Sequence, residues 1–459
     1  MQFSTLAGLA TLATSAAAAL TPITIRGNAF YSGNTRFYVR GVDYQPGGAS
    51  DPKDPLADTA ICGRDIPAMK ELGLNAIRVY IIDSAANHDE CMKMLDDAGI
   101  YLILDVNTPT HSITRNDPAI SYNEVYLQHV FGTMDVMSKY SNLMAYFAGN
   151  EVVNEESNTY AATYVKATVR DMKAYQKARN LRAIPIGYSA ADVAQNRQFI
   201  AEYMNSGPDA ERVDFHAFND YSWCGAASSY LISGYDQKVK NYTDYGIPAF
   251  LSEFGCNTNP PRQFKEIESI YHTNMTGVFS GGLVFEWTQE ENNFVRLNLF
   301  PTSDRLLLTY WIIKGLVEVS DDLKTIEPLV DYDNLKEMYE KIANPTGDGG
   351  ATVTSGEASE CPSRIPGVWD AECSLPAMPR RAEGYLKNGA GEPLGLDGPS
   401  NQWSGPAPPP SETETGGPAE ATTTSPNAAP GIIPSLNFVM IGSISSIVIA
   451  GLLGGAALL

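Results

Sequence analysis

The amino-acid sequence predicts a (β/α)8 barrel, and three observations support this fold class. Eight short apolar segments recur between residues 40 and 287, and segments with helical spacing separate them. Such alternation is typical of a parallel sheet, and eight repeats in about 250 residues match a closed barrel. Two of the apolar segments end on a glutamate, Glu151 and Glu253, and active sites in such barrels form where the strands end. A doubly wound open sheet is the alternative, but no glycine-rich phosphate loop follows the first strand.

The eight expected strands are apolar or mixed runs bounded by polar residues or glycine. Between them, residues 63–73 and 160–179 show helical spacing, and the first of these segments closes on a glycine, as helices often do. The strands are expected at Arg40–Gln45, Asn75–Ile82, Tyr101–Asn107, Met144–Glu151, Ala183–Ser189, Asp214–Tyr221, Pro248–Gly255 and Gly281–Trp287.

Segments on either side of the barrel have their own patterns. Ile23–Tyr31 and Thr35–Val39 flank a Ser-Gly-Asn turn, which predicts a β-hairpin that caps the floor of the barrel. Residues 335–342 are expected to form a last amphipathic helix, and the catalytic domain is expected to span residues 20–345. Residues 346–431 are rich in Pro, Gly, Ser, Thr and Glu, a composition that buries too little apolar surface to fold, so a disordered stalk is expected there.

Both chain ends carry apolar segments. Residues 1–19 resemble a secretory signal peptide, with a buried first helix as the alternative. Phe438–Leu459 carries no charge and follows the small triplet Asn427-Ala428-Ala429 and an eight-residue spacer. This order is typical of a glycosylphosphatidylinositol (GPI) anchor signal, here residues 432–459, which is removed after Asn427; a retained membrane anchor is the alternative.

Composition limits the partners. The formal net charge of -21 argues against binding to nucleic acid or to an anionic membrane surface, because both would repel the protein, whereas an uncharged polymer remains a natural partner. In a secreted chain the six cysteines indicate disulfides, and no cysteine or histidine spacing is typical of a metal site. No cofactor is expected. Asn-x-Ser/Thr motifs at Asn241 and Asn274 are candidate N-glycosylation sites.

The expected strands end in polar and aromatic residues, although barrel interiors are usually filled by branched apolar side chains. An open cleft that binds a polar ligand explains this concentration, but Asp105 and Ser189 could equally be hydrogen-bonded core residues. The residues concerned are Tyr44, Gln45, Arg78, Tyr80, Asp105, Asn150, Glu151, Ser189, Asn219, Tyr221, Glu253, Glu286 and Trp287.

Two carboxylates in a cleft with aromatic and amide side chains predict cleavage of glycosidic bonds. One carboxyl group must donate a proton to the leaving oxygen while the other attacks the sugar, and their repulsion raises the pKa of one of them. For a retaining enzyme we expect the carboxyl groups of Glu151 and Glu253 to lie roughly 5 to 5.5 Å apart. Arg78 and Tyr221 are expected to orient Glu253, and Asn150 to bond a sugar hydroxyl. Tyr44, Tyr80 and Trp287 are expected to offer flat faces to sugar rings.

The chain carries six ordered motifs: GVDYQPGG at 41–48, RVY at 78–80, GNEV at 149–152, YSWCG at 221–225, SEFGC at 252–256 and GGLVFE at 281–286. Together they resemble the fungal β-1,3-glucanosyltransferases of glycoside hydrolase family 72 over residues 20–345. The resemblance implies that Glu151 is the acid/base and Glu253 the nucleophile, with Gln45, Tyr80, Asp105, Asn150 and Tyr221 along the donor and acceptor sites. It further implies that an internal β-1,3-glucan bond is cut and the new reducing end is passed to another glucan chain.

The chain departs from that family pattern at three places. Phe285 stands where the family usually has tyrosine, and no Cys-rich carbohydrate module follows the barrel. Asn205 replaces a cysteine that commonly ties the barrel to the C-terminal segment. The resemblance then implies the disulfide pairs Cys62–Cys91, Cys224–Cys256 and Cys361–Cys373.

The implied protein is a monomer held by a GPI anchor at the outer face of the plasma membrane and in the cell wall. An endo-β-1,3-glucanase on the same barrel and a non-catalytic wall-binding protein are the alternatives.

Overall fold

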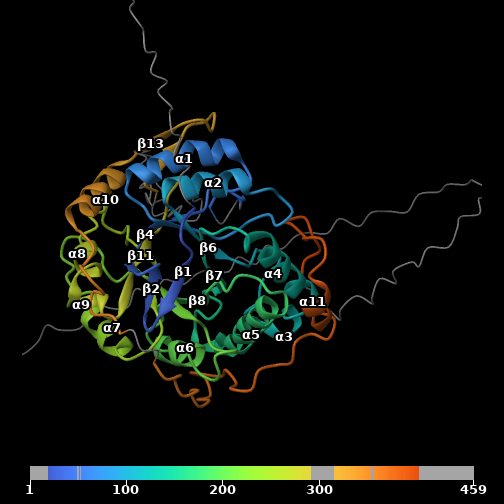
Figure 1. Cartoon of the computed structure of the whole chain (residues 1–459). Helices are drawn as coiled ribbons and strands as arrows, with labels where there is room; N and C mark the ends of the chain where they lie inside the picture. Colours follow the sequence, from blue (N-terminus) through green and yellow to red (C-terminus); the bar gives the residue numbers. More distant parts are fainter. Residues whose placement is uncertain (1–18, 49–50, 52, 291–314, 353–355, 403–459) are drawn as a thin grey trace, which may run out of the picture. The chain divides into compact units, whose positions relative to one another are not determined.

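The computed structural model describes residues 19–48, 51, 53–290, 315–352 and 356–402. Its centre is a closed barrel of eight parallel strands in the order β10-β11-β4-β5-β6-β7-β8-β9, surrounded by helices (Figure 1). The predicted (β/α)8 fold is confirmed, and each strand overlaps its expected range. The barrel strands are β4 (Val39–Tyr44), β5 (Ala76–Val79), β6 (Tyr101–Asp105), β7 (Leu143–Asn150), β8 (Ile186–Ala191), β9 (Phe215–Asp220), β10 (Ala249–Phe254) and β11 (Phe279–Val284).

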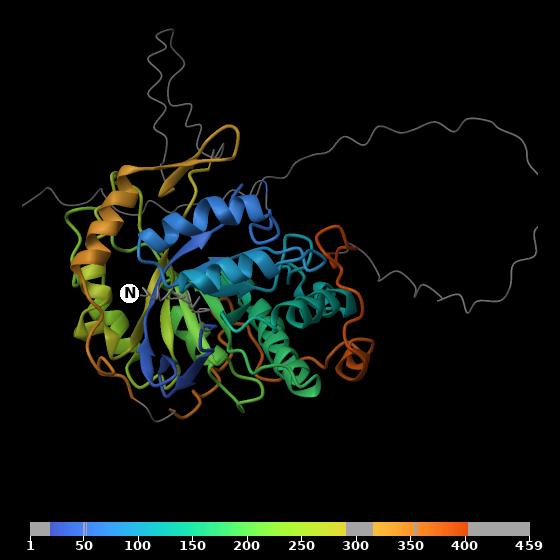
Figure 2. The same cartoon turned by 45° about the horizontal axis from the view of Figure 1, so that its top comes forward.

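The helices form an outer layer around the barrel (Figures 1 and 2). Local capping explains several of their ends: Asp58 accepts the N–H groups of Ala60 and Ile61 at the start of α1, and Gly99 ends α2 in the left-handed conformation. The helices are α1 (Thr59–Glu71), α2 (Asp89–Ala98), α3 (Pro118–Ser121), α4 (Glu124–Met137), the 3-10 helix η1 (Glu156–Ala161), α5 (Ala162–Ala178), α6 (Arg197–Met204), α7 (Tyr235–Tyr242), α8 (Glu266–Ile270), α9 (Thr273–Thr276), α10 (Val330–Lys341) and α11 (Glu383–Asn388).

A three-stranded antiparallel sheet covers one end of the barrel (Figure 1). Its strands are β1 (Ile23–Arg26), β2 (Ala29–Ser32) and β3 (Thr35–Phe37), so the predicted first arm of the hairpin is itself folded back at Gly27, which has a positive φ. Phe30 of β2 packs edge-to-face on Phe215 and Phe250 inside the barrel. Aromatic side chains therefore close the end of the barrel that lies opposite the C-terminal ends of its strands.

The predicted stalk is wrong as far as residue 402. Residues 356–402 pack along the helices of the barrel and belong to the same compact unit. Trp369 is fully buried between Phe199 and Tyr203. This segment needs no core of its own, because its few apolar side chains fill sites on the barrel. The amphipathic helix expected at residues 335–342 is α10, which begins earlier, at Val330.

The structure contains the three disulfides that the family resemblance implies: Cys62–Cys91, Cys224–Cys256 and Cys361–Cys373. Cys62 lies in α1 and Cys91 in α2, so this pair joins two neighbouring helices. Cys224 and Cys256 follow β9 and β10, so this pair joins two loops at the strand ends.

A short strand pair, β12 (Val317–Val319) and β13 (Ile326–Pro328), precedes α10. In the described part of the chain, no helix is both long and apolar enough to cross a bilayer. The expected tail at 432–459, the site at Asn427 and all but the last residue of the expected signal peptide lie outside the described residues.

Asn205 links the barrel to the C-terminal segment by hydrogen bonds. Its Nδ2 donates to Ser359 Oγ at 3.2 Å and to Tyr245 O at 2.8 Å, and its carbonyl accepts the N–H of Ser359 at 3.1 Å. Where the family commonly has a disulfide between the barrel and the C-terminal segment, this chain has hydrogen bonds of Asn205.

A disulfide placed at this contact should stabilise the fold. The double variant Asn205→Cys/Ser359→Cys closes a chain loop of 154 residues, for which the chain-entropy model gives an upper bound of about 5 kcal/mol. We expect a higher Tm in the oxidised double variant than in the oxidised wild type, measured by calorimetry. A double variant that melts below the wild type would contradict the contact geometry, and peptide mapping would detect pairing with Cys361 instead.

Candidate active site

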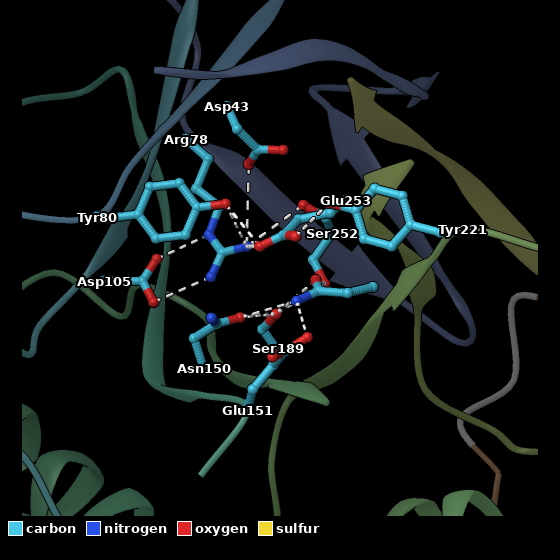
Figure 3. Close-up of polar contacts among 11 residues, drawn as sticks. Asp43, Arg78, Tyr80, Asp105, Asn150, Glu151, Ser189, Tyr221, Ser252 and Glu253 are labelled. Carbon is cyan, nitrogen blue, oxygen red and sulfur yellow. Dashed lines mark hydrogen bonds and ion pairs between the residues drawn. The ribbon is translucent and has the colours of Figure 1, made fainter. Parts of the chain in front are cut away.

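Glu253 lies at the end of β10 and receives three donors (Figure 3). Tyr80 donates its hydroxyl to Oε1 at 2.7 Å, and Tyr221 donates to Oε2 at 2.6 Å. Arg78 Nη1 lies 3.4 Å from Oε1. Donors on both oxygens fix the plane of the carboxyl group and stabilise its ionised form. The expected roles of Arg78 and Tyr221 in orienting this group agree with these contacts.

Arg78 is fully buried on β5 and organises the floor of the site. Its guanidinium forms two parallel bonds to Asp105, Nε to Oδ2 at 2.8 Å and Nη2 to Oδ1 at 3.1 Å, and it contacts Ser252 O at 3.3 Å. The rings of Tyr80 and Phe147 lie 4.1 Å and 4.6 Å from its central carbon. Burial leaves Arg78 and Asp105 little surface for a sugar: Arg78 contacts Glu253 and Asp105 holds Arg78, although the family resemblance implies that Asp105 lines a sugar site.

Asp43 is a buried acid that the sequence analysis did not single out. It pairs in register with Arg78 across β4 and β5, and its Oδ1 lies 3.9 Å from Nη1. Within the described residues neither of its carboxyl oxygens has a hydrogen-bond partner. Burial raises the pKa of Asp43 well above its ordinary value, and the charge of Glu253 raises it further. The position of Asp43 within the predicted strand at residues 40–45 was the signal in the sequence that could have indicated a buried acid at the site.

Glu151 directly follows β7 and has a φ of 47°, in the left-handed region. Its Oε1 accepts a hydrogen bond from Asn219 Nδ2 at 2.8 Å, and Asn219 also donates to Asn150 Oδ1 at 3.2 Å. Ser189 donates to Asn150 Oδ1 at 2.7 Å and contacts Ser252 Oγ at 2.8 Å. One hydrogen-bond network therefore connects the ends of β7, β8, β9 and β10, and Ser189 is a hydrogen-bonded core residue in it.

The two glutamates influence each other electrostatically. Burial raises the pKa of Glu253 to about 7; Arg78 lowers it and the charge of Glu151 raises it. Tyr221 and Tyr80 lower the pKa of Glu253 by bonding its ionised form. Burial, with a smaller contribution from the charge of Glu151, therefore raises the pKa of Glu253, which is the implied nucleophile and not the implied proton donor.

The structure contradicts two of the expected aromatic platforms. Tyr44 is 1% exposed, and its hydroxyl donates to Asp65 of α1 at 2.6 Å, so its ring faces the helix layer. Trp287 is 0% exposed and packs against Tyr332 of α10. Neither ring can meet a sugar, because strand residues alternate between the barrel interior and the helices, and Trp287 lies beyond the end of β11.

Other predicted contact residues keep access to the mouth. Tyr221 is 39% exposed, and its ring lies edge-to-face with Phe285 at 6.4 Å. Gln45, Tyr80 and Phe285 are partly exposed. The hydroxyl missing at Phe285 thus leaves an apolar ring beside Tyr221. Away from this mouth, the candidate glycosylation sites Asn241 and Asn274 are exposed. In the part of the chain that the structure describes, no group of three metal-ligating side chains is assembled.

The fold and the site together define a class. Two glutamates at the ends of the fourth and seventh strands of a (β/α)8 barrel, with one carboxyl group held by three donors, are the arrangement of an enzyme that cleaves glycosidic bonds. The chain belongs to glycoside hydrolase family 72. The sequence profile of this family, described as Glucanosyltransferase, matches residues 12–343.

Named relatives are similar over most of the chain. The 1,3-beta-glucanosyltransferase gel1 of Aspergillus fumigatus is 53% identical over 380 residues, covering 83% of this chain and 78% of the relative. The 1,3-beta-glucanosyltransferase GAS5 of Saccharomyces cerevisiae is 52% identical over 393 residues, covering 85% and 76%. The crystal structure of Saccharomyces cerevisiae Gas2p in complex with laminaritriose and laminaritetraose matches with a TM-score of 0.69 and 37% identity, covering 79% and 78%.

The hydroxyl groups of Tyr80 and Tyr221 should determine the pH below which kcat/KM falls. Glu253 must be ionised to attack, so kcat/KM should fall as the pH drops through about 7. Tyr80→Phe or Tyr221→Phe removes a bond to the ionised form and raises the pKa of Glu253 further. We expect the acid limb of kcat/KM to move up by about one pH unit.

Tyr44→Phe is the matched control, because its hydroxyl bonds Asp65 instead. We expect its pH profile to equal that of the wild type. An unchanged or lowered acid limb in both active-site variants would show that the tyrosines do not stabilise the carboxylate.

Proposed function

We propose that this protein is a retaining β-1,3-glucan transglycosylase that cuts an internal β-1,3-glucosidic bond and joins the new reducing end to another glucan chain. The observation that carries the proposal is the trio of donors on Glu253, two tyrosine hydroxyls and Arg78. A carboxylate so restrained is prepared to attack carbon rather than to activate water. The names of the relatives and the laminari-oligosaccharides bound to Gas2p support the same substrate.

The reaction proceeds in two displacements. Glu253 attacks the anomeric carbon while Glu151 gives its proton to the departing glycosidic oxygen, which forms a covalent glycosyl-enzyme and frees one glucan chain. Glu151, now ionised, then takes a proton from the hydroxyl of an acceptor chain, and that hydroxyl displaces Glu253. Two inversions leave the β configuration unchanged. The carboxyl separation of roughly 5 to 5.5 Å expected for this path stays a prediction.

Side chains at the mouth suit a glucan. Tyr221 and Phe285 present aromatic surface next to Glu253, and the partly exposed Asn150 and Gln45 supply amide groups for sugar hydroxyls. Net negative charge does not hinder an uncharged polysaccharide. Transfer in preference to hydrolysis requires an acceptor chain to occupy the mouth before water reaches the glycosyl-enzyme.

Substitution of the glutamates tests the assignment. Glu253→Gln removes the nucleophile and keeps its shape, so turnover of a defined laminari-oligosaccharide should fall by several orders of magnitude while binding persists. Glu151→Gln should be comparably slow, but an aryl glycoside with a good leaving group should restore the first step, which then needs no acid.

Chromatography of the products separates the possible functions. Products longer than the substrate indicate transfer, shorter products alone indicate hydrolysis, and intact substrate indicates binding only. Glu268→Gln is the control, since this exposed residue pairs with Lys341. Near-normal transfer by either active-site variant would refute the assigned roles.

We further propose that the mature protein is monomeric and resides outside the cell, on the plasma membrane and in the wall, through a GPI anchor attached near Asn427. The uncharged tail at 438–459 and the small residues before it support this proposal.

A phospholipase specific for GPI anchors tests the attachment. It should release the protein from isolated membranes, because the tail would have been exchanged for the lipid. A variant that lacks residues 438–459 should appear in the medium without phospholipase treatment. Protein that stays in the membrane after phospholipase treatment would indicate a retained span.

A further inference from the structure

The backbone of Glu151 is held from two sides. Its N–H donates to Ser189 O at 2.8 Å, which continues the pairing of β7 with β8. Its carbonyl oxygen accepts Arg115 Nη2 at 2.7 Å and Nε at 3.2 Å, and Nε also contacts Val152 O at 3.2 Å. The backbone of Glu151 has a positive φ, which residues other than glycine rarely adopt. Its conformation therefore depends on the hydrogen bonds that Ser189 and Arg115 make to its backbone.

Arg115 reaches Glu151 from the segment that connects β6 to α4, residues 106–123. This connection is mostly irregular: it contains a single bridge between Thr108 and His111 and the one-turn helix α3. Thr114, next to Arg115, donates its N–H to Ser121 Oγ at 2.9 Å and its hydroxyl to Asp117 O at 2.9 Å. These local contacts shape the connection but do not attach it to the rest of the protein.

Asn107, Ile113 and Tyr122 of the connection contact the barrel and its helices, and the end of the C-terminal segment, residues 399–402, adds a further attachment. Asn401 is fully buried; its Nδ2 donates to Ser112 O at 2.9 Å and Ser121 O at 2.6 Å, and its Oδ1 accepts the N–H of Ser112 at 3.1 Å. Its backbone bonds Thr110 and Asn123. One side chain thus ties both ends of the connection together, and every polar group of Asn401 is used.

Neighbouring residues extend this attachment. His111 Nε2 lies 3.0 Å from Pro399 O, and Gln402 Nε2 donates to Pro109 O at 2.8 Å and to Ser112 Oγ at 2.7 Å. Ser400 Oγ donates to Thr110 O at 2.9 Å. The partners lie about 290 residues apart in sequence, so the contact joins the end of the described chain to the mouth of the barrel (Figures 1 and 2).

We propose that Arg115 is a positioning residue for Glu151 and that residues 399–402 act as a strap that holds Arg115 in place. The strap fixes the connection 106–123, the connection directs the guanidinium, and the guanidinium fixes the carbonyl of the residue that donates the proton. Arg115 acts through the backbone of Glu151. This inference rests on the proposed role of Glu151 as acid/base.

The proposal predicts a selective defect. Arg115→Gln should lower kcat on laminari-oligosaccharides by about 10- to 100-fold, because a misplaced acid serves the poor leaving group of a natural sugar badly. On an aryl laminarioside with a good leaving group, the burst of released phenol should change less than about threefold, since that step needs no acid. Arg115→Lys should restore part of the loss by donating one hydrogen bond.

Controls separate this effect from loss of structure. Arg364→Gln removes an exposed arginine of the C-terminal segment that pairs with Asp370, and it should leave both substrates unaffected. Equal losses on both substrates after Arg115→Gln, or no loss on either, would overturn the proposal.

A double-mutant cycle distinguishes the two hypotheses. If Arg115 acts through Glu151, then Arg115→Gln should cause no further loss in a Glu151→Gln background. Full additivity would overturn the positioning role while leaving Glu151 as the acid. Near-normal activity of Glu151→Gln alone would instead refute the proposed function.

Substitutions in the strap test its part. The double variant Ser400→Ala/Gln402→Ala removes the three hydrogen bonds that these side chains donate to the connection, and it leaves the buried Asn401 in place, so it should fold normally. It should show the same preference for the activated substrate, with a smaller loss than Arg115→Gln. Asn401→Ala should be more severe, and its Tm would report any unfolding. Wild-type ratios of the two activities in the double variant would overturn the role of the strap.

Discussion

The buried guanidinium of Arg78 is the interaction on which the site depends. It is the single cation in contact with Asp43, Asp105 and Glu253 among the described residues, and no water-exposed surface screens it. The two shortest hydrogen bonds of Arg78 go to Asp105, and its contact with Glu253 is longer. The hydroxyl groups of Tyr80 and Tyr221 supply the shorter hydrogen bonds to Glu253. One positive charge among three acids leaves an excess of negative charge, and burial together with the charge of Glu253 raises the pKa of Asp43 well above its ordinary value. Arg78 and the two tyrosine hydroxyls therefore oppose the rise that burial causes in the pKa of Glu253.

The position of the strands could be read from the sequence because parallel barrel strands are buried on both faces and appear as continuous apolar runs. The two glutamates were recognisable because a carboxylate directly after such a run lies at the mouth. Orientation was harder to predict. Asp43 and Tyr44 are neighbours on β4, yet Asp43 faces Arg78 inside the barrel and Tyr44 faces Asp65 in α1. Alternation along the strand separates them, and the predicted aromatic contacts did not take this alternation into account.

The C-terminal segment could not be predicted for a different reason. Residues 356–402 have the composition of a disordered chain, and local propensity gives them little structure. Their order comes from a surface already formed by the barrel: Trp369 fills a site beside Phe199, and Asn401 satisfies the connection after β6. Contacts across about 290 residues leave no periodic pattern in either partner. For the same reason, no pattern in the sequence indicated that Arg115 would reach Glu151.

The aromatic plug under the barrel has a kinetic meaning. Phe30 seals the end of the barrel opposite the mouth by packing on Phe215 and Phe250, so the reacting sugar can be reached from one side only. In a transferase with one entrance, the chain released by the first displacement and the chain that accepts the sugar must pass through the same opening in turn. Departure of the first chain then precedes arrival of the second, which is the order of a ping-pong cycle. The glycosyl-enzyme must therefore last long enough for one glucan chain to leave this face of the barrel and for another to reach it.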